Sequence, residues 1–238
     1  MINLDDLIEA EIANGYGDEN ARAKVCQDII LKAISDGSLS KNVTIKGGVV
    51  MRGKTNNIRR ATQDIDIDFI RYSLDDDAIE RFIKKLNCIQ GISILRVGSI
   101  EELKQQDYKG KRVFVEISDT FGNRIPSKID LGVHTKLDIK QEEFCFDIAF
   151  DDDGASLLIN SNEQMFTEKL RSLLRFGAVS TRYKDIFDIT TVQDNFLSQN
   201  PALVDTMEGQ DFFEEHPKTI RTNPSARKGR RQSHSKNG

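Results

Sequence analysis

DIDIDFI, at residues 64–70, alternates between acidic and apolar side chains from Asp64 to Phe69. A period of two places the two kinds of side chain on opposite faces, which is the pattern of a β-strand. The acidic face consists of Asp64, Asp66 and Asp68. Carboxylates on one face of a strand repel one another, because neighbours are only about 7 Å apart. Two interpretations remain: a strand whose acidic face lies in water, or a cation site in which Mg²⁺ takes the carboxylate oxygens.

Two segments before this strand suit a phosphate group. Lys46, Gly47 and Gly48 stand between an expected strand and an expected short helix. Glycines let the backbone turn tightly and approach a ligand, and the start of a helix offers free N–H groups to phosphate. Arg60 and Thr62 come just before the acidic strand, and an arginine beside phosphate is sensible chemistry. Each feature alone is also an ordinary structural one, since most glycine pairs are plain turns and most arginines lie on the surface.

A further carboxylate stands in a later strand that otherwise reads as apolar. Lys128 and Asp130 share one face of that strand, and His134 follows on the same face. Asp130 could join two carboxylates of the acidic strand. Two divalent ions held by three carboxylates can clamp a triphosphate and activate the attacking oxygen in an in-line displacement. For His134 we expect a surface position.

The rest of the chain predicts an α+β protein, with a mixed sheet and flanking helices in the front part and a helical part behind it. Expected strands are residues 43–46, 64–70, 92–98, 111–118, 126–134 and 144–149. Expected helices are residues 2–12, 20–35, 49–53, 74–87, 162–176, 183–198 and 201–214. We divide the chain into an α/β domain at 1–155, a helical domain at 156–215 and a basic tail at 216–238.

Composition narrows the class of protein. The three cysteines of the 238 residues are far apart and odd in number, which favours buried thiols in a reducing cytoplasm. No apolar run reaches the roughly 18–20 residues that span a bilayer, so we expect no membrane partner. Residues 216–238 hold seven Lys and Arg and no acid, which leaves 27 basic and 38 acidic residues, a net charge of −11, before them. We expect this tail to be a disordered, solvated segment, with contact to RNA as the alternative.

Four blocks, in this order, resemble the polymerase-β-like nucleotidyltransferases, and more narrowly the AbiEii toxins of abortive-infection toxin–antitoxin pairs. The blocks are KGGVVMRG at 46–53, RATQDIDID at 60–68, KID at 128–130 and EKLRSLLRFGAVSTRYKDIFDI at 168–189. The resemblance covers about residues 25–195. One departure is that Val49 and Val50 follow the glycines, where the family often has Ser or Thr.

The resemblance implies a polymerase-β-like core and assigns roles to individual residues. The implied ligands of a two-ion Mg²⁺ site are Asp64, Asp66 and Asp130. The implied nucleotide-binding residues are Lys46, Gly47, Gly48, Arg60, Thr62, Lys128 and Lys169. Lys169 would reach the triphosphate or the base, and Asp185 would orient that lysine or the acceptor. Alternatively, Lys169 snorkels from the edge of the core, and Asp185 and Asp188 pair structurally with Arg182 or Lys184.

Three hypotheses about function follow. The first is a metal-dependent nucleotidyltransferase that acts as a growth-inhibiting toxin of a type IV-like system. It would transfer a nucleotide from a nucleoside triphosphate to a tRNA end, another nucleic acid or a protein hydroxyl, and a cognate antitoxin would be encoded nearby. The second is a nucleotide- or antitoxin-binding module of the same fold that has lost catalysis. The third is a plain structural α/β domain, with the acidic face pointing at solvent.

Overall fold

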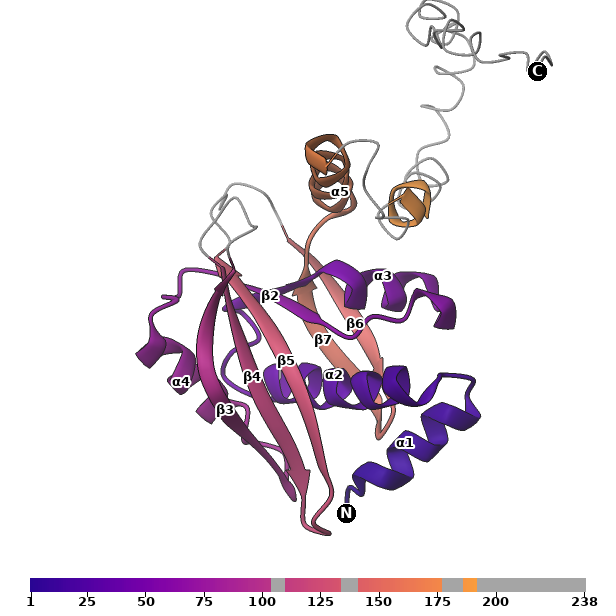
Figure 1. Ribbon diagram of the computed structural model, residues 1–238, viewed down its shortest axis with the longest axis vertical. Helices are drawn as coiled ribbons and strands as arrows, with labels where there is room; N and C mark the ends of the chain where they lie inside the picture. The colour runs from indigo at the N-terminus through magenta and orange to yellow at the C-terminus, as the bar shows by residue number, and fades with distance from the viewer. Residues whose placement is uncertain (104–109, 134–140, 177–185, 192–238) are drawn as a thin grey trace, which may run out of the picture. The chain divides into compact units, whose positions relative to one another are not determined.

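The protein is built around a seven-stranded mixed sheet, seen in a computed structural model that describes residues 1–103, 110–133, 141–176 and 186–191 (Figure 1). The strand order is β3-β4-β5-β2-β1-β7-β6. The strands are β1 (Val43–Lys46), β2 (Ile65–Phe69), β3 (Ile92–Leu103), β4 (Gly110–Asp119), β5 (Arg124–Val133), β6 (Glu142–Ile148) and β7 (Asp151–Ile159). β2 pairs with β5, and β1 with β7, in parallel, whereas the other neighbours are antiparallel. The expected α+β class is confirmed.

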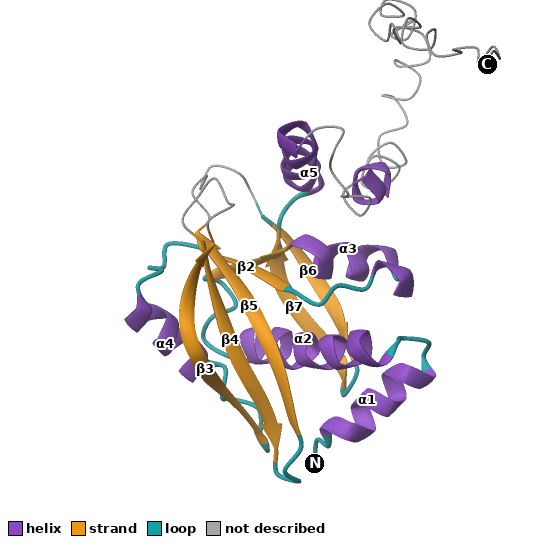
Figure 2. Cartoon of the chain, in the orientation of Figure 1, coloured by secondary structure: helices purple, strands orange, loops and turns teal. Residues whose placement is uncertain are grey.

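Figure 2 shows the helices in purple. They are α1 (Leu4–Ala13), α2 (Asp18–Asp36), α3 (Gly47–Thr55), α4 (Asp76–Lys85) and α5 (Asn162–Phe176), with a short 3₁₀ helix η1 (Ile58–Arg60) and helical residues at 186–191. α2, α3 and α4 pack on the sheet, while α1 packs on α2. α2 contacts β5, β6 and β7, and α4 contacts β3. α3 begins directly where β1 ends, so the two glycines of the phosphate-like segment form the first turn of a helix.

The apolar face of β2 is part of the hydrophobic core. Ile65, Ile67 and Phe69 are each at most 1% exposed. The ring of Phe69 packs edge-on against Phe82 of α4, with 5.0 Å between the ring centroids. Burial of this face fixes the register of β2, because a slip by one residue would turn the carboxylates into the core. The hydrophobic core therefore determines where the acidic residues point.

Most expected elements are confirmed, and the differences have physical reasons. β7 was not expected from the sequence, because its first residues, Asp151 to Gly154, have the composition of a charged turn. β7 also runs through the expected boundary at residue 155, and the compact unit to which the described residues belong spans Met1–Gln193. The expected helix 201–214, His134, Asp185 and the basic tail lie outside the described residues. In the described part of the chain, no helix is both long enough and apolar enough to span a membrane.

Candidate active site

Four ionisable residues form a line across four adjacent strands. In the strand registers, Arg112 of β4 lies opposite Asp130 of β5, Asp130 lies opposite Asp66 of β2, and Asp66 lies opposite Lys46 of β1. Residues that are register partners point to the same face of a sheet. The order across the sheet is therefore one cation, two carboxylates and a second cation.

The ionisation of Asp66, in the middle of the line, depends on its burial and on the charges around it. Burial raises the pKa of Asp66 to about 6, and the nearby Asp130 and Asp64 raise it as well, whereas Lys46 and Lys169 lower it. A charged Asp66 is thus costly while its neighbours are also charged. Carboxylates with this property cluster at functional sites, although structural ion pairs produce such shifts too.

Gly47 is required where β1 meets α3. Its φ of +70° belongs to the left-handed region, and a Cβ added there would lie 2.1 Å from Asp66 Oδ2. Any side chain at residue 47 would therefore displace the carboxylate of Asp66. The turn at Gly47 and the acidic strand are therefore in close contact.

Gly48 makes room for the segment that leads into β2. A Cβ at residue 48 would lie 2.7 Å from Thr62 Cβ and 2.8 Å from Thr62 Oγ1. Val49 and Val50, which follow, are fully buried. The hydroxyl of Thr62 therefore lies beside this turn, whereas Val49 and Val50 provide none.

The three remaining carboxylates each form an ion pair. Lys128 Nζ lies 2.7 Å from Asp64 Oδ1, and Lys46 Nζ lies 2.8 Å from Asp68 Oδ1. Arg112 donates two hydrogen bonds to Asp130, at 2.7 and 2.8 Å.

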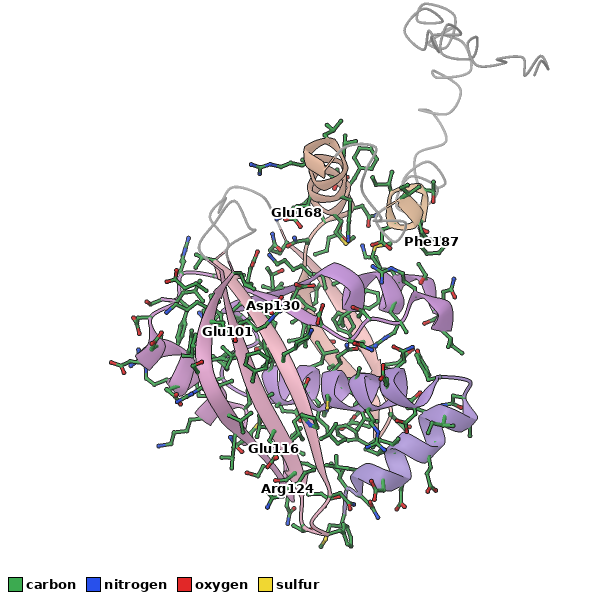
Figure 3. All side chains as sticks on the ribbon, in the orientation of Figure 1. Glu101, Glu116, Arg124, Asp130, Glu168 and Phe187 are labelled. Carbon is green, nitrogen blue, oxygen red and sulfur yellow. The ribbon has the colours of Figure 1, made fainter. Side chains whose placement is uncertain are left out.

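Asp130 is labelled on β5 in Figure 3. The positive side chains partly neutralise a group of carboxylates that would otherwise repel one another.

Lys169 of helix α5 belongs to a second cluster of charged residues, in which Asp188 is the shared carboxylate. Asp188 is fully buried and accepts two hydrogen bonds from Arg60, at 2.5 and 2.7 Å. Lys169 Nζ of α5 lies 3.0 Å from the same carboxylate. Lys169 also acts electrostatically on Asp66. Among the described residues, the carboxylate beside Lys169 is therefore Asp188, whereas Asp185, which we expected to orient this lysine or the acceptor, lies outside them.

Two further residues of the site escaped the sequence analysis. Arg112 stands in a strand with ordinary alternation, and only the register with β5 shows its partner. Glu168, labelled on α5 in Figure 3, accepts a hydrogen bond from Asn160 Nδ2 at 3.2 Å and interacts electrostatically with Lys46 and Asp68. Glu168 directly precedes Lys169 in the sequence, and this position next to a candidate site residue was the only sequence feature that pointed to it.

The donor chemistry of the site fits Mg²⁺, which prefers carboxylate oxygens. Asp66 and Asp130 lie opposite each other on two adjacent parallel strands, and Asp64 directly precedes β2. Asp66 forms no ion pair within the part of the chain that the structure describes. In the same part of the chain, no group of three or more Asp, Glu, His and Cys side chains is close enough together to hold an ion as it stands. The side chains of Asp64 and Asp130 are held by Lys128 and Arg112 instead.

A family model supports the assignment of the fold and the chemistry. The model described as "Nucleotidyl transferase AbiEii toxin, Type IV TA system" matches residues 29–236. The chain belongs to this family. As a member of the AbiEii family it is a nucleotidyltransferase, and the resemblance carried by the four blocks is confirmed.

Solved structures and curated proteins were also compared with this AbiEii family member. A solution structure of the antibiotic-resistance factor ANT(2'')-Ia is 15% identical, with a TM-score of 0.43, and the match covers 81% of this chain and 100% of that chain. A crystal structure of ANT(2")-Ia in complex with adenylyl-2"-tobramycin is 16% identical, with a TM-score of 0.45, over 79% and 94% of the two chains. No curated protein matches the chain.

Proposed function

We propose that this nucleotidyltransferase uses Mg²⁺ to transfer a nucleotide from a nucleoside triphosphate to a nucleic-acid acceptor such as tRNA. The observation that carries the proposal is the register of β2 and β5, which sets Asp66 directly opposite Asp130. Asp64, Asp66 and Asp130 would hold the metal, which supplies the positive charge that the triphosphate and the attacking oxygen need. The ion pairs of Lys128 and Arg112 must open, or share their carboxylates, when the metal binds.

The reaction exchanges one phosphorus–oxygen bond for another. The acceptor oxygen forms a bond to the α-phosphorus and loses its proton, while the bond from the α-phosphorus to the bridging oxygen breaks. The electron pair of that bond leaves with pyrophosphate. In this proposal the metal–triphosphate complex would bind at the two carboxylates in the middle of the line of charges, between Lys46 and Arg112.

The first turn of α3 suits the triphosphate. Gly47 and Gly48 form the first turn of the helix, where the backbone N–H groups have no partner within the helix. Thr62 adds a hydroxyl beside this turn. These groups would bind phosphate oxygens as donors, while the carboxylates bind them through Mg²⁺.

Lys169 would contribute charge to the outer phosphates. Its ion pair with Asp188 is 3.0 Å long, and Arg60 holds Asp188 from another direction. This arrangement restricts the rotamers of Lys169, so less side-chain entropy is lost when a phosphate binds. Arg60 acts through Asp188 and is a positioning residue in this proposal.

The toxin role follows from the family and implies a cognate antitoxin. The proposal is tested by incubating the purified protein with Mg²⁺, total RNA and each α-³²P-labelled nucleoside triphosphate. We expect label in a defined RNA species with one or two of the triphosphates. Label on the protein itself, or none on RNA with any triphosphate, would contradict the proposed acceptor. Binding of triphosphate without any transfer would instead favour the inactive binding module.

A further inference from the structure

A buried amide connects α2 to the segment that precedes β2. Gln27 is 1% exposed, and its Nε2 donates a hydrogen bond to the carbonyl oxygen of Thr62 at 2.8 Å. The same nitrogen donates to the carbonyl oxygen of Asp64 at 3.4 Å. One side chain thus holds the backbone on both sides of Gln63, where the chain enters the acidic strand.

The other end of this amide is fixed by a buried charge network. Gln27 Oε1 accepts a hydrogen bond from Arg52 Nη1 of α3. Arg52 Nη2 lies 3.8 Å from Asp28 Oδ1, and the fully buried Asp28 accepts hydrogen bonds from Lys24 Nζ and from the backbone N–H of Ala149. Because Arg52 can only donate, the oxygen of Gln27 faces Arg52 and its nitrogen faces the two carbonyls.

We infer that Gln27 is a positioning residue for the metal site. It fixes the backbone of Thr62 and Asp64, so that the carboxylate of Asp64 lies beside that of Asp66 and the hydroxyl of Thr62 lies beside Gly48. The inference rests on the proposed function, in which Asp64 is a metal ligand. Gln27 itself touches neither metal nor nucleotide.

A purely structural role for Gln27 makes a different prediction from a positioning role. If Gln27 is only a structural cross-link, a variant loses stability, but its folded molecules bind metal with the affinity of the wild type. A positioning residue changes the geometry of the folded site, so each folded molecule binds metal more weakly. Outer partners of metal ligands typically affect metal affinity or activity by about 10- to 100-fold.

The experiment measures binding of Mn²⁺ alone to the full chain by isothermal titration calorimetry. The variants are Gln27→Met, which keeps the length of the side chain but removes both polar ends, and Gln27→Glu, which keeps an acceptor for Arg52 but cannot donate to the carbonyls. Glu19→Ala is the matched control, because Glu19 forms an exposed 3.2 Å contact with Gln63, between the same helix and the same segment. Thermal unfolding of each variant establishes the folded fraction.

We expect both Gln27 variants to bind Mn²⁺ about 10- to 100-fold more weakly than the wild type and the control. We expect Gln27→Glu to lose less thermal stability than Gln27→Met, because it still accepts from Arg52. In transfer assays kcat should fall and the half-maximal Mg²⁺ concentration should rise, with KM for the triphosphate nearly constant. Wild-type Mn²⁺ affinity in a folded Gln27 variant would overturn the inference, and so would failure of both variants to fold, because that result shows a structural role only. Absence of Mn²⁺ binding by the wild type would instead contradict the metal site of the proposed function.

Discussion

Asp66 on β2 and Asp130 on β5 lie directly opposite each other, as register partners of two parallel strands. Like charges in this position repel, and the repulsion contributes to the raised pKa of Asp66. The repulsion between the two carboxylates destabilises the protein without a bound cation, and a bound cation would turn the same pair into a favourable interaction. The electrostatic cost of this pair is the physical basis of the proposed metal site.

Gly47→Ala should abolish transfer and destabilise the fold. The left-handed backbone costs an alanine about 1–2 kcal/mol, and the added Cβ would also meet Asp66 Oδ2 at 2.1 Å. Gly98→Ala is the matched control, because Gly98 has the same φ of +70° and nothing within 4 Å of the added Cβ. Urea unfolding should therefore show a larger loss for Gly47→Ala, and only this variant should lose activity. Equal losses of stability would show that the side chain of Asp66 moves away from the added methyl group at little energetic cost.

Asp188→Ala should be strongly destabilising. The change leaves Arg60, which is 6% exposed, and Lys169 without their shared carboxylate. Breaking a buried ion pair from one side costs about 3–5 kcal/mol.

The control for this variant is Glu116→Gln, which breaks a more exposed pair with Arg124 and should change the free energy of unfolding by less than about 1 kcal/mol. Equal effects of the two substitutions in urea unfolding would show that the Asp188 cluster contributes no more than a surface pair.

Lys169→Ala should weaken binding of a nucleoside triphosphate more than that of the monophosphate, because the proposed contact is to the outer phosphates. Lys169→Arg should restore binding only in part, since the broader guanidinium needs more room beside Asp188. Titration in Mg²⁺ with both ligands measures the difference, and Lys85→Ala, at an exposed position of α4, is the control. Equal losses for both ligands would indicate a contact to the base or the α-phosphate, and no loss would leave Lys169 a structural residue.

The site shows which features of a sequence can be interpreted directly. The alternation at residues 64–70 predicted β2 because burial of one face imposes a period of two, and the amphipathic stripe of residues 162–176 predicted α5 with the observed ends. The glycine pair before α3 was predicted as a tight turn, and Gly47 indeed adopts a positive φ.

The partners of charged residues were harder to predict, because they depend on register and on contacts between distant segments. The sequence placed Asp66 and Asp130 in strands, but not opposite each other. Lys169 was expected to be oriented by Asp185, which lies outside the described residues, and its ion pair with Asp188 was not predicted. Gln27 carries no local signal, since its contacts lie 35 and 37 residues away along the chain.

Expression of the wild-type protein without an antitoxin should slow the growth of its host, and Asp66→Asn should relieve this effect. The substitution removes a negative charge and a proposed metal ligand while it keeps the shape of the side chain, so the protein level should be unchanged. Growth curves with immunoblots measure both quantities, and Asp77→Asn, at an exposed position of α4, is the control. Equal toxicity of wild type and Asp66→Asn would indicate a cause other than catalysis.

The most direct test of the metal-dependent mechanism is the rate of transfer of labelled nucleotide to RNA by wild type, Asp66→Asn, Asp130→Asn and Asp77→Asn, in Mg²⁺ and after chelation. The account predicts that chelation stops the wild type and that Mg²⁺ restores it. It also predicts that Asp66→Asn and Asp130→Asn each lose at least about 100-fold in rate, while Asp77→Asn stays active. Thermal stability should be unchanged or raised in Asp66→Asn, whereas Asp130→Asn should be less stable because Arg112 loses its carboxylate partner. Turnover by either site variant at close to the wild-type rate in Mg²⁺, or wild-type turnover in the presence of the chelator, would contradict it.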